Sequence, residues 1–146
     1  MANTYRGTTL AGQAVEVEVA GQQIAALREI SATATLPLIA PPLVDLQNNG
    51  AKALAFNRVH ENPQTLETVA RHALRHGVGR LLATITTQPY EESLESLATI
   101  DRQLTADSFL ARCYPGIFFE GQADFRLAVD FIKTCFDTGT PSPVSY

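Results

Sequence analysis

Polar side chains stand at the ends of apolar runs in the second part of this sequence. Asp45, Gln47 and Asn49 close or follow the run LVDLQ. In parallel α/β folds the working residues lie at the carboxyl ends of strands, because the loops that follow those strands meet at one edge. The three residues share one parity, so a regular strand would project them to the same side. We expect them to face the interior or the mouth of a barrel.

Two later apolar runs end in further candidates. The run RLLATITT contributes Thr84, Thr86 and Thr87, and the run GIFFE ends in Glu120. A carboxylate at the end of a buried strand is either a ligand or a cap for the helix that follows. Composition and spacing alone favour the cap or a solvated side chain.

Two histidines have a spacing that also occurs in metal sites. His72 and His76 lie four residues apart in a predicted helix, as in a helical metal pair. The zinc-protease form, His-Glu-x-x-His, is absent because Ala73 follows His72. A solvent-exposed helix face is therefore the favoured interpretation. The segment Gly77-Val78-Gly79 is not a dinucleotide fingerprint, because the third glycine is missing and the order is helix to strand.

The arginines and cysteines have simpler explanations. Arg71, Arg75 and Arg80 form a local basic run. A phosphate site is conceivable there, but cations near the carboxyl end of a helix are favourable without any ligand. Cys113 and Cys135 would be nucleophiles only beside an activating base. Packing is favoured for both, with Cys113 in a buried strand and Cys135 on a helix face.

The first forty residues predict strands. The segment Ala14–Ala20 (AVEVEVA) alternates apolar residues with Glu, which indicates a strand with one wet face. Residues 22–30 can return beside it after Gly21, so we expect an antiparallel hairpin. Pro41 and Pro42 exclude a helix and fit a chain that changes direction between two layers.

After residue 42 strands and helices alternate. The expected strands are 43–47, 80–87 and 111–121. The expected helices run from Asn62-Pro63 to Gly77, from Pro89 through Leu104, and from about Phe125 to near Gly139 and Pro141. Such alternation predicts parallel strands, buried on both faces, with right-handed crossovers. Three units cannot close a barrel of eight strands, so the sheet is either open or an incomplete barrel.

Composition limits the classes of function. The chain has 146 residues, a formal net charge of −4 and 45% hydrophobic residues, which indicates a folded domain. The acidic balance argues against nucleic-acid binding by phosphate neutralisation. No apolar run reaches the length of a membrane span, and the first residues, MANTYRGTTLAG, do not form a secretory signal. We expect a cytoplasmic protein without a nucleic-acid or membrane partner.

Three motifs together carry a family resemblance. PPLVDLQNNG, GVGRLLATITT and YPGIFFEG resemble the amino-terminal part of N-acetylglucosamine-6-phosphate deacetylases, which belong to the amidohydrolase superfamily. That family has the order Pro-Gly-hydrophobic-Asp-hydrophobic-Gln-x-Asn-Gly, Gly-x-Thr-x-x-x-Pro-Thr and Gly-hydrophobic-His-hydrophobic-Glu-Gly-Pro. Many amidohydrolases carry a His-x-His metal pair where the deacetylases have Gln-x-Asn, which falls on Gln47 and Asn49. The resemblance covers about residues 15–121.

The sequence departs from the family pattern at several positions. Phe118 stands in place of the usual His, Gln122 in place of Pro, and Ala83 in place of the Pro of the second motif. Beyond Gly121 the likeness ends, as a truncation or a reading-frame shift near residue 121 would produce. The relation of residues 122–146 to the family is therefore uncertain.

The resemblance implies both an architecture and a chemistry. Residues 1–40 would be strands of a small β-sandwich, and residues 41–146 an incomplete TIM barrel containing the first three β/α units. The implied reaction is hydrolysis of N-acetylglucosamine 6-phosphate to glucosamine 6-phosphate and acetate, with zinc or iron as the metal and a homodimer as the usual assembly. Glu120 would be a metal ligand, and Gln47 and Asn49 would shape the floor of the metal site.

The family's catalytic Asp and its metal-binding histidines cannot be placed in this chain. We therefore expect little or no turnover from the chain alone. The alternative is a non-catalytic binding module, or an inactive fragment of such an enzyme.

Overall fold

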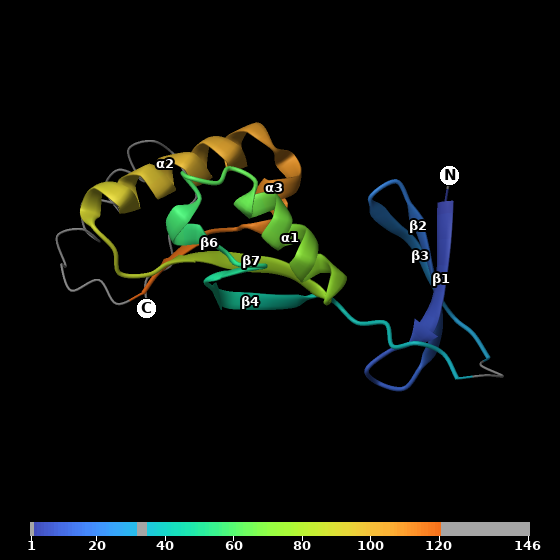
Figure 1. The fold of residues 1–146 in the computed structure, drawn as a ribbon. Helices are drawn as coiled ribbons and strands as arrows, with labels where there is room; N and C mark the ends of the chain where they lie inside the picture. Colours follow the sequence, from blue (N-terminus) through green and yellow to red (C-terminus); the bar gives the residue numbers. More distant parts are fainter. Residues whose placement is uncertain (1, 32–34, 121–146) are drawn as a thin grey trace. The chain divides into compact units, whose positions relative to one another are not determined.

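The structure is a computed structural model, and it describes residues 2–31 and 35–120. The chain divides between Pro41 and Pro42 into two compact units (Figure 1). The predicted third helix, from about Phe125 to near Gly139, lies outside the described residues, as do Cys135 and Gln122. No helix in the described part of the chain combines the length and the apolar composition that crossing a membrane requires.

The first unit is a three-stranded antiparallel sheet. Its strands are β1 (Ala2–Thr8), β2 (Ala14–Ala20) and β3 (Gln23–Glu29), in the order β1-β2-β3. The predicted hairpin is confirmed, with Gly21 at φ +63° between β2 and β3. Strand β1 was not expected from the sequence, because its residues ANTYRGT show no regular alternation.

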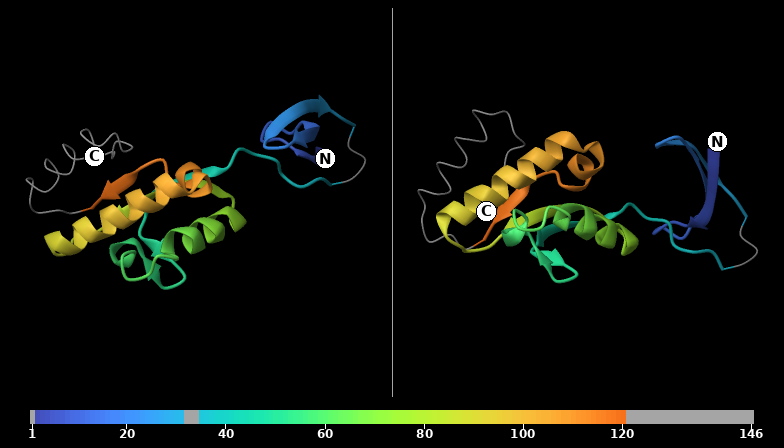
Figure 2. Two further views of the ribbon diagram at one scale, coloured as in Figure 1. Left: turned by 90° about the horizontal axis from the view of Figure 1, so that it is seen from above. Right: turned by 45° about the horizontal axis from the view of Figure 1, so that its top comes forward.

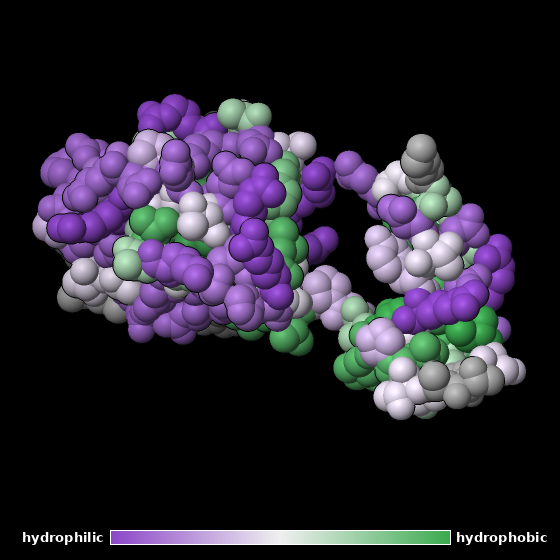
Figure 3. Space-filling model, turned by 45° about the vertical axis from the view of Figure 1, so that its right-hand side comes forward, coloured by the Kyte–Doolittle hydropathy of each residue, from purple (hydrophilic) through white to green (hydrophobic). Residues whose placement is uncertain are grey.

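The two faces of this sheet differ in chemistry. Cross-strand pairing places Arg6, Glu16 and Arg28 on one face, and Arg6 Nε lies 2.8 Å from Glu16 Oε2. The opposite face pairs Tyr5 and Leu27 with the central Val17. Tyr5 and Leu27 remain 55% and 64% exposed, so part of an apolar sheet face is open in this unit. Figure 3 shows hydrophobic surface on this unit.

The second unit is an α/β layer. Its elements are β4 (Leu43–Asn48), β5 (Gly50–Ala51), β6 (Leu54–Ala55), a 3₁₀ turn η1 (Phe56–Arg58), α1 (Thr65–Arg75), β7 (Val78–Ile85), α2 (Tyr90–Ala106), α3 (Ser108–Cys113) and β8 (Ile117–Phe119). Strands β4, β7 and β8 form a parallel sheet in that order, as predicted, and β5 and β6 form a separate antiparallel pair. Figure 1 shows the helices over one face of the parallel sheet, and Figure 2 shows α3 at the carboxyl end of the long α2.

The core of this unit lies between the helices and β7. Leu81, Ala83 and Ile85 alternate along β7 and pack in a cluster with buried residues of all three helices. The ring of Tyr114 meets that of Phe56 edge to face, at 5.7 Å between centroids. Because its hydroxyl donates to Leu66 O at 2.7 Å, Tyr114 can be almost fully buried without an unpaired polar atom.

Helix α1 begins later than the sequence indicates. Asn62 is not its cap, because its Oδ1 accepts from Gln64 N in a turn that precedes the helix at Thr65. The predicted end is correct, since Gly77 has φ +82° and its amide donates to Leu74 O. Leu74 does not belong to the apolar face and is 44% exposed.

Helix α2 starts after Pro89 as predicted, but its buried face is not a stripe of large apolar side chains. Ser93, Ser96, Leu97 and Ile100 are buried, whereas Leu94 is exposed. Small hydroxyl side chains allow the helix to approach η1 closely, a contact that a search for large apolar residues overlooks.

The predicted strand over 111–121 is wrong in its first half. Helix α3 occupies that segment, because the Asp107 carboxylate caps it by accepting from Phe109 N at 2.7 Å and from Leu110 N at 3.4 Å. Within the described residues 111–120, only Ile117–Phe119 forms a strand. Cys113 therefore lies in a helix, not in a strand, but it is buried in the core as expected.

Strand β4 is also less buried than predicted. Leu43, Val44 and Leu46 are 66%, 55% and 60% exposed. The strand lies at the edge of the parallel sheet and pairs only with β7 among the described strands. Its apolar composition is that of a strand covered on both faces, and the described residues do not supply that cover.

Candidate functional site

The ends of the three parallel strands lie along one edge of the sheet. Asn48 pairs with Ala83, and Phe119 pairs with Ile85. The amide of Glu120 continues this pairing by donating to Ile85 O at 3.1 Å. Glu120 is therefore anchored at the carboxyl end of β8, beside the end of β7, and its side chain is partly buried.

The end of β4 is irregular, so the regular strand that the parity prediction assumes does not extend to its last residues. The register shifts between Asp45 and Asn48, as in a β-bulge. The Asp45 carboxylate folds back onto this segment, accepting from Gln47 N at 3.1 Å and from Asn48 Nδ2 at 2.8 Å. Asp45 thus serves to shape the strand end, while Gln47 and Asn49 are exposed.

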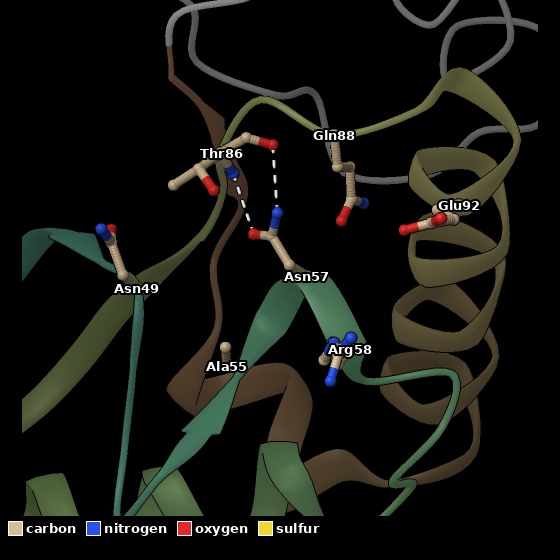
Figure 4. Close-up of a pocket in the computed structure, with 7 residues that line it drawn as sticks. All are labelled: Asn49, Ala55, Asn57, Arg58, Thr86, Gln88 and Glu92. Carbon is tan, nitrogen blue, oxygen red and sulfur yellow. Dashed lines mark hydrogen bonds between the residues drawn. The ribbon is translucent and has the colours of Figure 1, made fainter.

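A pocket of about 400 Å³ opens at this edge (Figure 4). The residues that line it come from the end of β4, from β6 and η1, from the segment after β7 and from the start of α2: Asn49, Ala55, Asn57, Arg58, Thr86, Gln88 and Glu92. Of the candidates from the sequence, the pocket brings together only Asn49 and Thr86. Gln47 and Glu120 lie at the carboxyl ends of β4 and β8, on either side of β7, and do not line the pocket.

Asn57 holds the rim of the pocket in place. Its Nδ2 donates to Thr86 O at 3.2 Å, and its Oδ1 accepts from Thr86 N at 3.0 Å (Figure 4). The side-chain amide thereby pairs with the backbone just beyond β7, much as another strand would. Sequence reasoning missed this residue, because an isolated Asn 29 positions from its partner gives no local signal.

A second polar link ties η1 to α2. The buried Ser96 Oγ donates to Asn57 O at 2.8 Å. Its oxygen is 2.9 Å from His60 Nδ1 and, with its hydrogen already used, must accept from an Nδ1–H. His60 Nε2 then faces the carboxylates of Glu61 and Glu95, at 3.9 and 3.8 Å. These bonds fix the loop that carries Asn57 and Arg58.

The threonines after β7 differ in burial. Thr84 is fully buried within the strand, Thr86 is half-buried at the pocket, and Thr87 is exposed. Only Thr86 lines the pocket, so only Thr86 is placed to contact a ligand there.

The pocket is suited to a polar ligand. Amide groups, a guanidinium and a carboxylate surround it, which provides donors and acceptors for hydroxyl groups and one cation for an anionic group. A bound metal would need more ligands than this part of the chain provides. Residues 2–31 and 35–120 contain no group of three or more His, Cys, Asp or Glu that could hold a metal ion. The Glu120 carboxylate suits zinc or iron, but only as one ligand of a shell.

The resolved pKa shifts lie away from the pocket. Burial raises the pKa of the Cys113 thiol and raises that of the Tyr114 hydroxyl. A raised thiol pKa disfavours the thiolate, and the Cys113 side chain is packed in the core. The pKa of His72 is lowered, first by partial desolvation and then by the neighbouring His76 and by cations.

The basic run does not assemble an anion site. Arg71 is paired with Glu67, at 2.7 Å between Nη2 and Oε1, and lies over the ring of Phe109. Arg75 and Arg80 are exposed. His76 is exposed as predicted, whereas His72 is partly covered.

Comparison with known proteins shows which solved structures this architecture resembles. No protein-family model and no curated protein matches the sequence. Among solved structures, the N-acetylglucosamine-6-phosphate deacetylase of Pasteurella multocida matches 96% of this chain with a TM-score of 0.67 and 19% sequence identity. The fold of this chain matches the amino-terminal part of such a deacetylase.

Two further deacetylase structures agree. A variant of the Mycobacterium smegmatis N-acetyl-D-glucosamine-6-phosphate deacetylase, in complex with N-acetyl-D-glucosamine-6-phosphate, matches 83% of the chain with a TM-score of 0.62 and 21% identity. Another structure of the M. smegmatis deacetylase matches 84% with a TM-score of 0.58 and 23% identity. The resemblance drawn from the motifs is thus confirmed at the level of the fold.

The match covers only part of these deacetylases. The chain spans 43% of the P. multocida protein, and 32% and 35% of the two M. smegmatis chains. An amino-terminal portion of the deacetylase fold accounts for this extent.

Proposed function

We propose that this chain is the amino-terminal part of a metal-dependent deacetylase that converts N-acetylglucosamine 6-phosphate into glucosamine 6-phosphate and acetate. The observation that carries the proposal is the match of 96% of the chain to a deacetylase structure. The Gln47-x-Asn49 motif and Glu120 support it, since both lie at the carboxyl edge of the parallel sheet, where catalytic groups of such folds are found.

The architecture proposed for the whole enzyme follows from the surfaces that this chain leaves open. Strands β4, β7 and β8 would be the first three of a TIM barrel, in which a later strand would pair with the free edge of β4. The open face around Tyr5 and Leu27 would pack against a second sheet to form the β-sandwich.

Glu120 is proposed as one ligand of the divalent metal, zinc or iron. When bound, the metal would polarise the amide carbonyl and lower the pKa of a bound water to about 7. A catalytic zinc takes three protein ligands, so histidines outside this chain would have to complete the shell. The catalytic Asp would also come from that part, and the chain alone should show little or no turnover.

The amide side chains would contribute binding. Gln47 and Asn49 would shape the floor of the metal site, and Asn49 also lines the pocket. Among the residues of that pocket, Arg58 would attract an anionic group and Glu92 would accept from sugar hydroxyls. The cytoplasm is the proposed location and a homodimer the proposed assembly, both by analogy with the family.

A fusion protein tests this proposal. Residues 1–120 would be joined to the matching remainder of the P. multocida deacetylase and purified with Zn²⁺ or Fe²⁺. Release of glucosamine 6-phosphate is the expected result, and Glu120→Gln should reduce it by about 100-fold or more. Glu91→Gln, an exposed carboxylate on α2, is the matched control and should have no effect. A fusion that folds cooperatively and binds metal but releases no product would contradict the proposal.

A second candidate function is that of a non-catalytic interaction module. The exposed Leu43, Val44 and Leu46 of the edge strand β4 favour it, because an open apolar strand edge pairs readily with another chain. This function needs no metal and should survive Glu120→Ala. Sedimentation of the chain with and without Val44→Lys measures its self-association. Self-association that is lost in the variant supports the interaction module, and a monomer in both cases argues against it.

A further inference from the structure

A histidine pair stands on the last turn of α1, apart from the sheet edge. His72 lies in the helix, and His76 is its carboxyl-terminal cap residue. Residues four apart on a helix project from the same face, and the two ring centroids are 4.4 Å apart with the planes at 57°. Helix α1 leads through Gly77 into the amino end of β7, whereas Glu120 lies beside the carboxyl end of β7.

The hydrogen bonding of His76 fixes which of its nitrogens is available. Its Nδ1 is 2.9 Å from His72 O, and a carbonyl oxygen only accepts, so Nδ1 carries the proton. In the neutral ring Nε2 then holds the free electron pair. Metal-bound histidines characteristically donate their other ring N–H to a carboxylate, a backbone carbonyl or a water, which sets the tautomer and the orientation of the ring.

The separation of the rings suits a shared ion. A metal–nitrogen distance of about 2.0–2.1 Å puts each ring centroid about 3.1 Å from the metal. For nitrogen–metal–nitrogen angles between a right angle and a tetrahedral one, the centroids would be about 4.5–5 Å apart. The observed 4.4 Å lies close to the lower end of this range.

We propose that His72 and His76 form a two-histidine binding site for a divalent first-row metal ion that prefers imidazole, such as Zn²⁺, Ni²⁺ or Cu²⁺, with water completing the shell. The carboxyl end of α1 carries partial negative charge, which favours a cation there. The site is separate from the proposed catalytic metal and uses none of its residues.

Two cations near the pair oppose a bound dication. Lys52, in the turn between β5 and β6, and Arg75 both act electrostatically on His72. Removing one of these charges should tighten metal binding, so Lys52→Gln is a gain-of-binding test. This prediction is specific to a site at His72, because a site elsewhere would not respond to Lys52 in this way.

The test is calorimetric titration of the untagged chain with Zn²⁺ in a non-chelating buffer. His72→Gln and His76→Gln should each weaken binding by about tenfold or more, because one ligand loses its pre-positioned partner. The double variant Leu74→His, His76→Gln keeps the number of histidines but puts them two residues apart on different faces, and it should bind as weakly as His76→Gln. Leu74 is exposed, so this change does not disturb the core.

Far-ultraviolet circular dichroism of each variant checks that α1 remains folded. Tighter binding in Lys52→Gln, together with these losses, would establish the site. Zn²⁺ affinity unchanged by His72→Gln and His76→Gln, or restored by the Leu74→His double variant, would overturn it.

Discussion

Adding a single methyl group at Gly50 should strongly lower the free energy of unfolding. Gly50 follows the Gln47-x-Asn49 motif at φ +128°, a backbone conformation that side chains rarely adopt. A Cβ there would overlap Leu54 O and would lie 2.9 Å from Ala55 Cα, both in the backbone of the facing strand β6. Neither neighbour can rotate away, so the hairpin β5–β6 would have to open.

The magnitude follows from two separate costs. A disallowed φ costs about 1–3 kcal/mol, and forcing an extra group into a packed position costs about 1–3 kcal/mol. We expect Gly50→Ala to lower the free energy of unfolding by about 3 kcal/mol or more. Gly77→Ala is the matched control, because Gly77 also has positive φ, at +82°, but nothing lies within 4 Å of its would-be Cβ. It should cost only about 1–2 kcal/mol.

Urea unfolding followed by circular dichroism compares the two variants. With a slope of about 2 kcal/mol per molar urea, the midpoint should fall by about 1.5 M for Gly50→Ala and by clearly less for Gly77→Ala. Equal shifts, or a larger shift for Gly77→Ala, would refute the close approach of β6 to Gly50. The contact between Gly50 and β6 would then not hold the loop that brings Asn57 to the pocket.

Three other predictions concern the pocket rim, the β5–β6 turn and the histidine pair. Asn57→Ala removes both bonds to Thr86 and should lower the free energy of unfolding by about 2 kcal/mol, measured by urea unfolding; a loss under about 0.5 kcal/mol would contradict the clamp. Ala53 has φ +61°, so Ala53→Gly should raise that free energy by about 0.5–1 kcal/mol, and a lower urea midpoint would count against it. His76→Gln should raise the pKa of His72, followed by NMR titration. Since the folded-state pKa of His72 lies below its unfolded value, this group should reduce stability as pH falls through about 6.5, and an unchanged pKa would argue against the coupling.

The elements that the sequence predicted are those with a local cause. The alternation of AVEVEVA gave the strand β2, and Pro89 followed by two Glu marked the start of α2. The capping residue of α3 could have been recognised, because Asp107-Ser108 is a helix-start signal. The pair β5–β6 had no such signal, since Lys52 and Ala53 occupy its turn at positive φ, where Asn and Gly are usual.

The candidate site was predictable only as an edge of the sheet. Strand order and the ends of apolar runs placed Asn49, Thr86 and Glu120 on that edge. The bulge at Asp45 and the clamp by Asn57 arise from contacts between segments that the sequence does not bring together. The exposure of β4 could not be predicted from the sequence either, because its apolar composition is that of a strand covered on both faces.

We propose that this chain is the front part of a deacetylase. Reading the source DNA past codon 121 in all three frames would test this proposal. The proposal predicts that one frame continues with Pro after Glu-Gly and then encodes further alternating strands and helices, with His and Asp at strand ends. If no frame continues the fold in this way, the proposal is contradicted, and the interaction module becomes the better account of the chain.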